Sequence, residues 1–320
     1  MLTPLGWAAA RYELGPRALR WSTTAALLVS IIIVFTGGLV RVTGSGLGCP
    51  TWPTCDGVSL APSAELGIHG VIEFTNRLLT TVIVIAVGWV IIAARLQRPR
   101  VRSVTRLAWS QFWLVVANAI AGGITVLVQL NPWVVALHFV LAIALLATTA
   151  LTWHRVHEDR TLDPGPLSSA VRVQSVVLVL ATTALILVGT LVSGSGPHSG
   201  DSADVPRMQL DWSGVAAVHG ILGALVLMLA LGLLIATRGA GERERLVRRR
   251  VIVLLAVVVA QGLIGVIQTH TGLPVSLVSV HLLGAALVWV GTLRVLLDVN
   301  PGLFAGVGFG TSTSGIAASS

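Results

Sequence analysis

Charged side chains are scarce in this sequence, and lysine is absent. Asp, Glu, Lys and Arg together make up 11% of the 320 residues, whereas 54% of the residues are hydrophobic. A soluble domain of this size needs more polar side chains to cover its surface. The composition therefore argues against a soluble enzyme and predicts an integral membrane protein.

Eight apolar runs are long enough to cross the hydrocarbon core of a bilayer, which takes about 20 helical residues. They predict an all-α protein with eight transmembrane helices in the cell membrane. The first run lacks a small-residue cleavage site after a short apolar core, so we expect it to be retained rather than removed as a signal peptide. The runs lie at roughly residues 22–41, 68–94, 107–128, 133–153, 173–193, 212–236, 250–268 and 276–298.

The arginines indicate how the chain is oriented in the membrane. They cluster before the first predicted span and in the connections that follow the second, fourth and sixth spans, whereas the opposite connections contain little beyond Arg41 and Arg207. By the positive-inside rule, both termini are expected to be cytoplasmic. The net charge of +8 then reflects topology, and no nucleic-acid partner is expected.

Cysteine occurs only twice, at Cys49 and Cys55 in the stretch GSGLGCPTWPTCDG (44–57). The predicted topology places this stretch on the outer face of the membrane, where a disulfide can persist. Five residues separate the two cysteines and include Pro50 and Pro53, so a tight closed loop is feasible. A structural role and a redox role both stay open.

The two halves of the chain resemble each other. TGGLVRVTGSG (36–46), at the end of the first span, is similar to VGTLVSGSG (188–196), at the end of the fifth. Asn76 and His138 are 62 residues apart, as are His219 and His281, and a shift of 143 residues maps the first pair onto the second.

This repeat predicts two pseudo-symmetric four-helix bundles, related by an axis along the membrane normal. Residues 1–160 are expected to form the N-terminal bundle and residues 161–299 the C-terminal bundle. The remaining segment, 300–320, is rich in Gly, Ser and Ala and is expected to be disordered.

Asn76 and the three histidines of the repeat all fall near the outer start of their predicted spans. An intramembrane polar side chain is costly unless it has a partner inside the bundle, so such residues indicate a functional site. A lone histidine in a helix is more often a packing residue, but three at a repeated spacing favour ligands. The three are His138, His219 and His281.

His219 and His281 lie on separate predicted helices with no intramembrane carboxylate near them, which disfavours a zinc or copper site. Small neighbours such as Ala216 and Gly284 leave a slot wide enough for a flat macrocycle. The chain contains only three methionines, which disfavours methionine ligation. We therefore predict a bis-histidine haem that relays electrons.

The stretch GIHGVIEFTNRLLTT (67–81) places His69, Glu73, Asn76 and Arg77 on the first turns of the second span. Their spacings of three and four residues put them on roughly one face of the helix. A carboxylate beside a haem in apolar surroundings is suited to transfer protons. The alternative is an ion pair between Arg77 and Glu73 that anchors the helix at the membrane boundary.

Together these features resemble the haem A synthase family, membrane enzymes that convert haem O to haem A for cytochrome oxidase. The resemblance covers residues 20–298 and includes GGLVRVTGSGLGCPTWPTC (37–55), IEFTNRLLT (72–80) and the histidines that open the fourth, sixth and eighth spans. GSGPHSGD (194–201) and the arginine-only, alanine-rich composition resemble the actinobacterial branch. The family oxidises a porphyrin methyl group through an alcohol to a formyl group.

The resemblance implies a substrate-haem, catalytic N-terminal half and a C-terminal half that holds haem b, with both sites in the outer leaflet. The implied partners are haem O as substrate, the lipid bilayer, the farnesyltransferase that produces haem O, and an electron donor that the sequence does not identify. The matching residues are His219 and His281 as axial ligands of the haem b iron, His138 as a ligand of the substrate haem iron, Glu73 as the catalytic carboxylate, and Cys49 and Cys55 as the outer disulfide.

One position departs from the family pattern, because Asn76 stands where the motif Glu-x-x-His-Arg has its histidine. Either His69 replaces the missing ligand, although it lies roughly 10 Å farther out along the helix, or His138 alone holds the substrate. We count His69, Asn76 and Arg77 among the substrate-haem-binding residues, and Arg77 or Arg41 is suited to meet a haem propionate.

The alternative function is a di-haem, b-type membrane cytochrome that transfers electrons from quinol. Such a protein accounts for the histidines but leaves Glu73 and the cysteines without a task. Five other polar residues are expected to lie outside the site. His154 and His157 are predicted on the cytoplasmic surface, and His198, Asp201 and Asp204 in a solvated outer loop.

Overall fold

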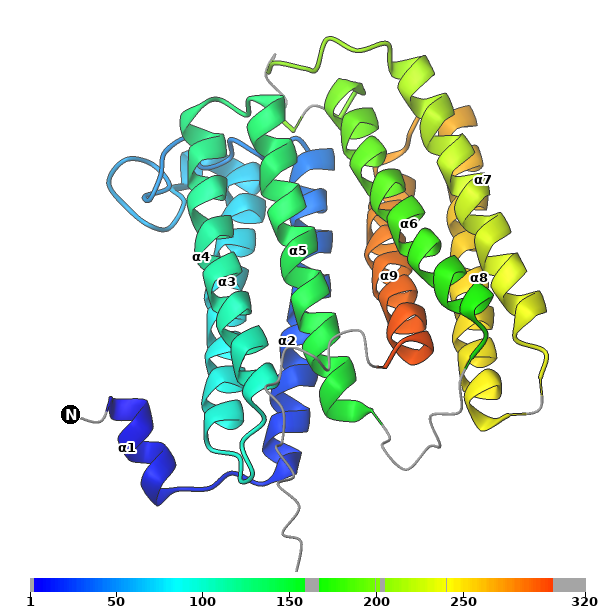
Figure 1. The fold of residues 1–320 in the computed structure, drawn as a ribbon. Helices are drawn as coiled ribbons and strands as arrows, with labels where there is room; N and C mark the ends of the chain where they lie inside the picture. The colour runs from blue at the N-terminus through cyan, green and yellow to red at the C-terminus, as the bar shows by residue number, and fades with distance from the viewer. Residues whose placement is uncertain (1–2, 159–166, 199, 202–204, 240, 302–320) are drawn as a thin grey trace, which may run out of the picture.

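The computed structural model describes residues 3–158, 167–198, 200–201, 205–239 and 241–301, and within these ranges the chain is helical apart from its connections (Figure 1). Except for residues 300 and 301, the tail that we predict to be disordered lies outside the described residues. The helices are α1 (Pro4–Arg11), α2 (Pro16–Val42), η1 (Ala64–Leu66), α3 (Gly67–Arg95), α4 (Arg102–Leu127), α5 (Pro132–His157), α6 (Ser169–Ser195), α7 (Trp212–Ala236), α8 (Glu242–His270) and α9 (Val275–Val299).

Eight of these helices, α2 to α9, are long and apolar enough to cross a membrane, one for each predicted span. Most extend several residues beyond the apolar run, because their polar flanks continue the helix. In α8, for example, Glu242 and Glu244 occupy the first turn, where negative charge stabilises the helix N-terminus. The sequence does not predict the short helix α1, whose start is capped by the hydroxyl of Thr3, which accepts the N–H of Gly6.

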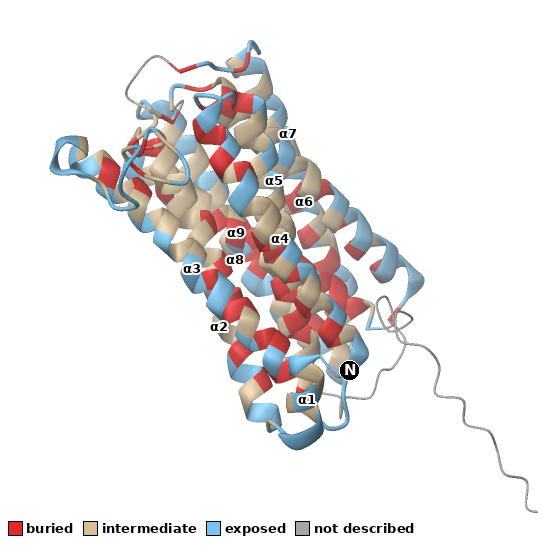
Figure 2. Ribbon diagram, turned by 90° about the vertical axis from the view of Figure 1, so that its left-hand side faces the viewer, coloured by how far each residue is buried: buried red, intermediate tan, exposed pale blue. Residues whose placement is uncertain are grey.

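The eight long helices pack in two groups of four. In the first group α2 contacts α3 and α5, and α4 lies between α3 and α5; in the second, α6 contacts α7 and α9, and α8 lies between α7 and α9. The groups meet where α9 packs against α2 and α5 around a shared core that includes Leu27, Leu146 and Trp289. Buried residues concentrate inside the molecule (Figure 2), whereas apolar side chains such as Ile221 and Val253 are exposed on the outer helices, as expected for contact with lipid.

The connections that follow α2, α4, α6 and α8 lie at one end of the molecule, and α1 lies at the other end (Figure 1). The helices α3, α5, α7 and α9 therefore all begin at the same end. We call this the loop end, and we call the opposite end, where the arginine clusters lie, the arginine end.

The ends of α2 and α6 and the connections that follow α2, α6 and α8 form a junction at the loop end. The guanidinium of Arg41 donates to the carbonyl oxygens of Ser193 and His198, at 2.9 and 3.1 Å. The backbone N–H of Leu47 donates to a carboxylate oxygen of Asp201 at 3.0 Å. The imidazole of His198 lies 2.9 Å from the carbonyl oxygen of Leu273.

His198 and Asp201 lie in the loop between α6 and α7, as predicted, but they are half-buried and their side chains bind backbone groups of other segments, while Asp204 lies outside the described residues. The prediction of a surface position is wrong for His154. Helix α5 continues past its apolar run, so His154 is buried, with its Nε2 3.6 Å from a carboxylate oxygen of Asp298 on α9. His157, one turn later, is half-buried and stacks on Trp153.

Candidate haem site

The four positions of the repeat lie at comparable depth from the loop end. Asn76 is the tenth residue of α3, His138 the seventh of α5, His219 the eighth of α7 and His281 the seventh of α9. At a rise of about 1.5 Å per residue, these residues lie roughly 9 to 14 Å along their helices. The two groups of helices therefore each contain two site positions within one layer of the molecule.

His219 and His281 approach each other from α7 and α9. Their ring centres are 6.3 Å apart and their ring planes are inclined by 67°. The Nδ1 atom of His219 lies 3.1 Å from the carbonyl oxygen of Leu185 on α6. When Nδ1 carries the proton and donates it to this carbonyl, the lone pair of Nε2 is available to bind a metal. The Nδ1 atom of His281 is buried and has no hydrogen-bond partner among the described residues.

This pair fits two axial ligands of one metal. Two imidazoles that bind one metal from opposite sides have ring centres about 6 Å apart, because each metal–nitrogen bond is about 2.0 Å long. The described residues contain no group of three or more His, Cys, Asp or Glu side chains that could hold a metal ion. A haem, whose macrocycle supplies the other ligands, therefore suits these two histidines better than a bare ion does.

A glycine on the preceding helix faces each of the three histidine rings. Because glycine has no side chain, the ring can lie close to the neighbouring backbone. Two of the glycines, Gly122 and Gly265, are separated by the same 143 residues as the ligands that they face. A Cβ atom added to Gly122 would lie 3.2 Å from Cε1 of His138, one added to Gly189 would lie 2.9 Å from Cε1 of His219, and one added to Gly265 would lie 3.7 Å from Cε1 of His281.

In the first group of helices, the sequence position equivalent to His219 is occupied by an amide. Asn76 is half-buried, and its Oδ1 atom accepts a hydrogen bond of 2.9 Å from the hydroxyl of Thr36 on α2. The Nδ1 atom of His138 is buried and has no hydrogen-bond partner in the described ranges. His69 lies on the first turn of α3, where its Nδ1 is 2.9 Å from the hydroxyl of Ser45. His69 and Asn76 are thus engaged at different depths by different partners.

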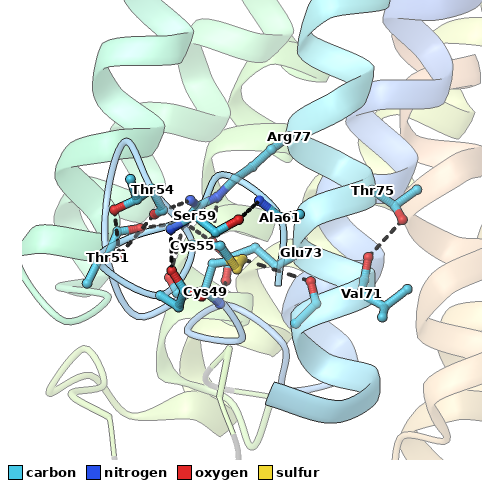
Figure 3. The surroundings of a disulfide bond; sticks show 12 residues. Cys49, Thr51, Thr54, Cys55, Ser59, Ala61, Val71, Glu73, Thr75 and Arg77 are labelled. Atoms are coloured by element: carbon cyan, nitrogen blue, oxygen red, sulfur yellow. Dashed lines mark hydrogen bonds and ion pairs between the residues drawn. A yellow bond between two sulfur atoms is a disulfide. The ribbon is translucent and has the colours of Figure 1, made fainter. Parts of the chain in front are cut away.

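Glu73 and Arg77 join α3 to the loop that contains the two cysteines (Figure 3). Cys49 and Cys55 form a disulfide and are both fully buried. Glu73 is only 6% exposed; one carboxylate oxygen accepts the N–H of Cys49 at 2.6 Å, and the other accepts two hydrogen bonds from Arg77, at 2.6 and 3.1 Å. The ion pair that the sequence allows is therefore present, but it is buried under the loop rather than placed on a surface.

Arg77 binds the disulfide loop through both of its terminal nitrogen atoms. Beyond the two bonds to Glu73, it donates to the carbonyl oxygens of Cys49, Thr51 and Thr54, each at 3.1 Å. The same loop reaches α4, because the indole of Trp52 lies directly against Gly123, the residue next to Gly122. The disulfide loop thus covers the loop end of the first group of helices and connects Glu73 with the neighbourhood of His138.

The sequence reasoning missed several of these residues. Thr36, Trp52, Leu185 and the ring-facing glycines were not assigned to the site. Only the glycines had a usable signal, since the 143-residue offset also relates Gly122 to Gly265. Backbone acceptors such as the carbonyl of Leu185 have no signature in the sequence.

Comparison with known proteins shows the family to which the chain belongs. The family described as cytochrome oxidase assembly protein matches residues 19–293. A heme A synthase of Lysinibacillus sphaericus is 30% identical over 180 residues, which cover 55% of this chain and 58% of that protein, and one of Staphylococcus haemolyticus is 33% identical over 124 residues, or 38% and 40% of the two chains. A heme A synthase of Bacillus mycoides is 25% identical over 277 residues, or 83% of this chain and 88% of that protein. The chain thus spans about half the length of some relatives and most of the length of others. Because the family match extends over most of the sequence and includes every histidine and cysteine of the site, the chain belongs to the cytochrome oxidase assembly protein family.

Proposed function

We propose that this protein is a haem A synthase, an oxidoreductase of the cell membrane that converts the methyl group of haem O to the formyl group of haem A through an alcohol. The observation that carries the proposal is the pair His219 and His281, with ring centres 6.3 Å apart and a backbone carbonyl next to Nδ1 of His219. The family match over residues 19–293 and the relatives named heme A synthase support the proposal.

The C-terminal half, residues 161–299, would hold haem b as a resident cofactor. His219 and His281 would hold its iron, since their rings approach each other to 6.3 Å from two helices of one bundle. Bound there, the cofactor supplies one-electron transfer without an open coordination position for substrate. The carbonyl of Leu185 would fix the orientation of the His219 ring, and Gly189 leaves the space that this ring occupies.

The N-terminal half, residues 1–160, would bind haem O. We assign His138 as its one histidine ligand, because Asn76 is hydrogen-bonded to Thr36 and His69 contacts Ser45 at a different depth. Asn76 then lines the side of the pocket opposite His138 without binding as histidine does. A substrate held by one protein nitrogen is released more readily than one held by two, which suits an enzyme that must let its product leave.

Glu73 would be the catalytic carboxylate on the substrate side. It lies one turn from Asn76 on α3, and the N–H of Cys49 together with Arg77 fixes its orientation. A buried carboxylate in this position can accept a proton from the reacting group and return it. Because the donors of Arg77 are committed to the loop, we assign Arg77 the role of positioning Glu73 rather than of binding a propionate.

The disulfide loop would close the outer side of this pocket. Within the ring closed by the Cys49–Cys55 disulfide, Trp52 packs against Gly123 of α4 and the N–H of Cys49 binds Glu73 of α3, so this ring would link the two sides of the pocket. The further partners that we propose are the farnesyltransferase that produces haem O and an external electron donor. Both haem sites would lie in the outer leaflet half of the membrane, with both termini on the cytoplasmic side.

Expression in a bacterial host that makes haem O but no haem A tests the proposed activity. We expect haem A in the extracted membranes with the wild-type chain and none with Glu73→Gln, while both retain haem b. A wild-type protein that is loaded with haem b and supplied with haem O, yet yields no haem A, would show that the chain is an electron-transfer cytochrome instead.

A further inference from the structure

A basic pocket lies at the arginine end of α3 and α4, whereas Glu73 on α3 and His138 on α5 lie toward the loop end. Its volume is about 530 Å³, and it extends from the last residue of α3 over the first three turns of α4. The side chains that define it, which we call the α3–α4 pocket, are Arg95, Arg100, Arg102, Arg106, Trp109 and Trp113.

Three of the arginines of this pocket have no carboxylate partner among the described residues. No carboxylate of the described residues lies within ion-pair distance of Arg95, Arg100 or Arg102. The Nε atom of Arg95 is buried and has no hydrogen-bond acceptor there. Burial, and then repulsion by Arg95 and Arg102, lowers the pKa of Arg100 below its usual range. Arg95, Arg100 and Arg102 therefore lie near one another with no carboxylate of the described residues to offset their charges.

The tryptophans indicate what kind of anion fits. Trp109 and Trp113 follow Arg102 by seven and eleven residues on α4, so they lie about 10 and 16 Å deeper along the helix. The side chain of Trp113 is 63% exposed on the side of the helix bundle, although Trp113 lies on a helix that is long and apolar enough to cross the membrane. Tryptophan rings favour the headgroup level of a bilayer, where one part of the ring is apolar and the other is wet. A ligand with an anionic head and an apolar body matches this order of side chains.

We propose that the α3–α4 pocket binds the headgroup of an anionic phospholipid. The arginines donate to its phosphate group, which the planar guanidinium can bind through two parallel hydrogen bonds. The glycerol and the first part of the acyl chains lie along Trp109 and Trp113. Lipids that carry negative charge at a membrane surface are attracted to such juxtamembrane arginines in general, and the pocket adds a defined position for one of them.

Lipid titration of the full-length, haem-loaded protein tests this proposal. The protein is stripped of lipid in a neutral detergent, and phosphatidylglycerol or phosphatidylcholine is added while bound lipid is counted by native mass spectrometry. We expect one phosphatidylglycerol to bind much more tightly than phosphatidylcholine. The variant Arg100→Gln/Arg102→Gln should weaken this binding about 30-fold, at about fivefold for each arginine.

The matched control is Arg245→Gln/Arg249→Gln, which removes the same charge from exposed positions on α8 outside the pocket. This control should bind phosphatidylglycerol as the wild type does, and Arg100→Lys/Arg102→Lys should retain most of the affinity. Equal losses in the pocket variant and in the control would overturn the proposal, because they would show a general charge effect. Displacement of the phosphatidylglycerol by millimolar inorganic phosphate would overturn it too, because the ligand would then be a free anion.

Discussion

Replacing Gly189 by alanine should displace the imidazole of His219 and weaken haem b binding. The added Cβ would lie 2.9 Å from Cε1 and 3.3 Å from Nδ1 of the ring. Carbon atoms are in favourable contact at about 3.5–4.0 Å, so the ring must retreat by about 0.6–1.1 Å. This movement disturbs the contact between Nδ1 and the carbonyl of Leu185, which orients the ligand. Disturbing such an orienting contact typically lowers metal affinity about 10- to 100-fold.

Gly265→Ala is the matched control for this substitution. Its Cβ would lie 3.7 Å from Cε1 of His281, an ordinary contact, and no other atom would come within 4 Å. Both substitutions replace a glycine inside a helix and bring the same gain in helix propensity, about 0.8–1.0 kcal/mol. Any difference between the two variants therefore reports on the histidine ring rather than on helix stability.

The assay is the rate at which purified protein loses haem b to an excess of a haem-scavenging apoprotein, together with the haem content per chain. We expect faster loss and lower content in Gly189→Ala, and near wild-type behaviour in Gly265→Ala. If both variants retain haem b equally and their spectra are unchanged, His219 is not an axial ligand and the assignment of the C-terminal site is wrong.

Further predictions concern the N-terminal site. Glu73→Gln keeps the size of the side chain but removes its charge, so haem A formation should fall by at least about 100-fold while haem b content stays the same; unchanged turnover would remove Glu73 from the mechanism. Asn76→His should add a second histidine ligand for the substrate haem, visible as a new low-spin signal in electron paramagnetic resonance and as slower product release, and the absence of a new signal would show that this position does not face the iron. Cys49→Ser/Cys55→Ser should lower activity more than haem b content. The loop stays attached to α3 because Arg77 still binds three loop carbonyls, but the covalent ring beside Glu73 is lost. Equal losses of activity and of haem b would indicate that the disulfide is needed for folding. The Asp56 carboxylate accepts the backbone N–H groups of Ser59 and Val58, and these hydrogen bonds lower its pKa. Its stabilisation of the loop is therefore fully present above the unfolded pKa of about 3.9 and is lost only as the pH falls through the lower folded pKa. The activity of Asp56→Asn should follow the wild-type pH profile between about pH 5 and 8, because Asp56 does not titrate in that range.

Much of the fold follows from the sequence because a bilayer imposes a simple requirement on length and hydrophobicity. Each predicted span is a helix, and the error lies at the ends, where polar flanks continue the helix. His154 illustrates the consequence: the apolar run ends before it, yet α5 carries it into a buried contact with Asp298. The limit of an apolar run marks where the hydrocarbon core ends and not where the helix ends.

The candidate site was predictable only where spacing gives information. The 62- and 143-residue intervals relate Asn76 and the histidines, and the same offset relates Gly122 to Gly265. The contact between Thr36 and Asn76 has no such signal, because a threonine in a membrane helix ordinarily bonds to a carbonyl of its own helix. The carbonyl partners of Arg77 were equally hidden, since any loop residue supplies a backbone acceptor.

The haem composition of the purified protein tests the central claim most directly. Protein isolated from a host that makes haem O should contain about one haem b per chain and, in addition, haem O or haem A in the N-terminal half. Two haem b per chain, with neither haem O nor haem A, would contradict the proposed function and indicate a di-haem electron-transfer cytochrome.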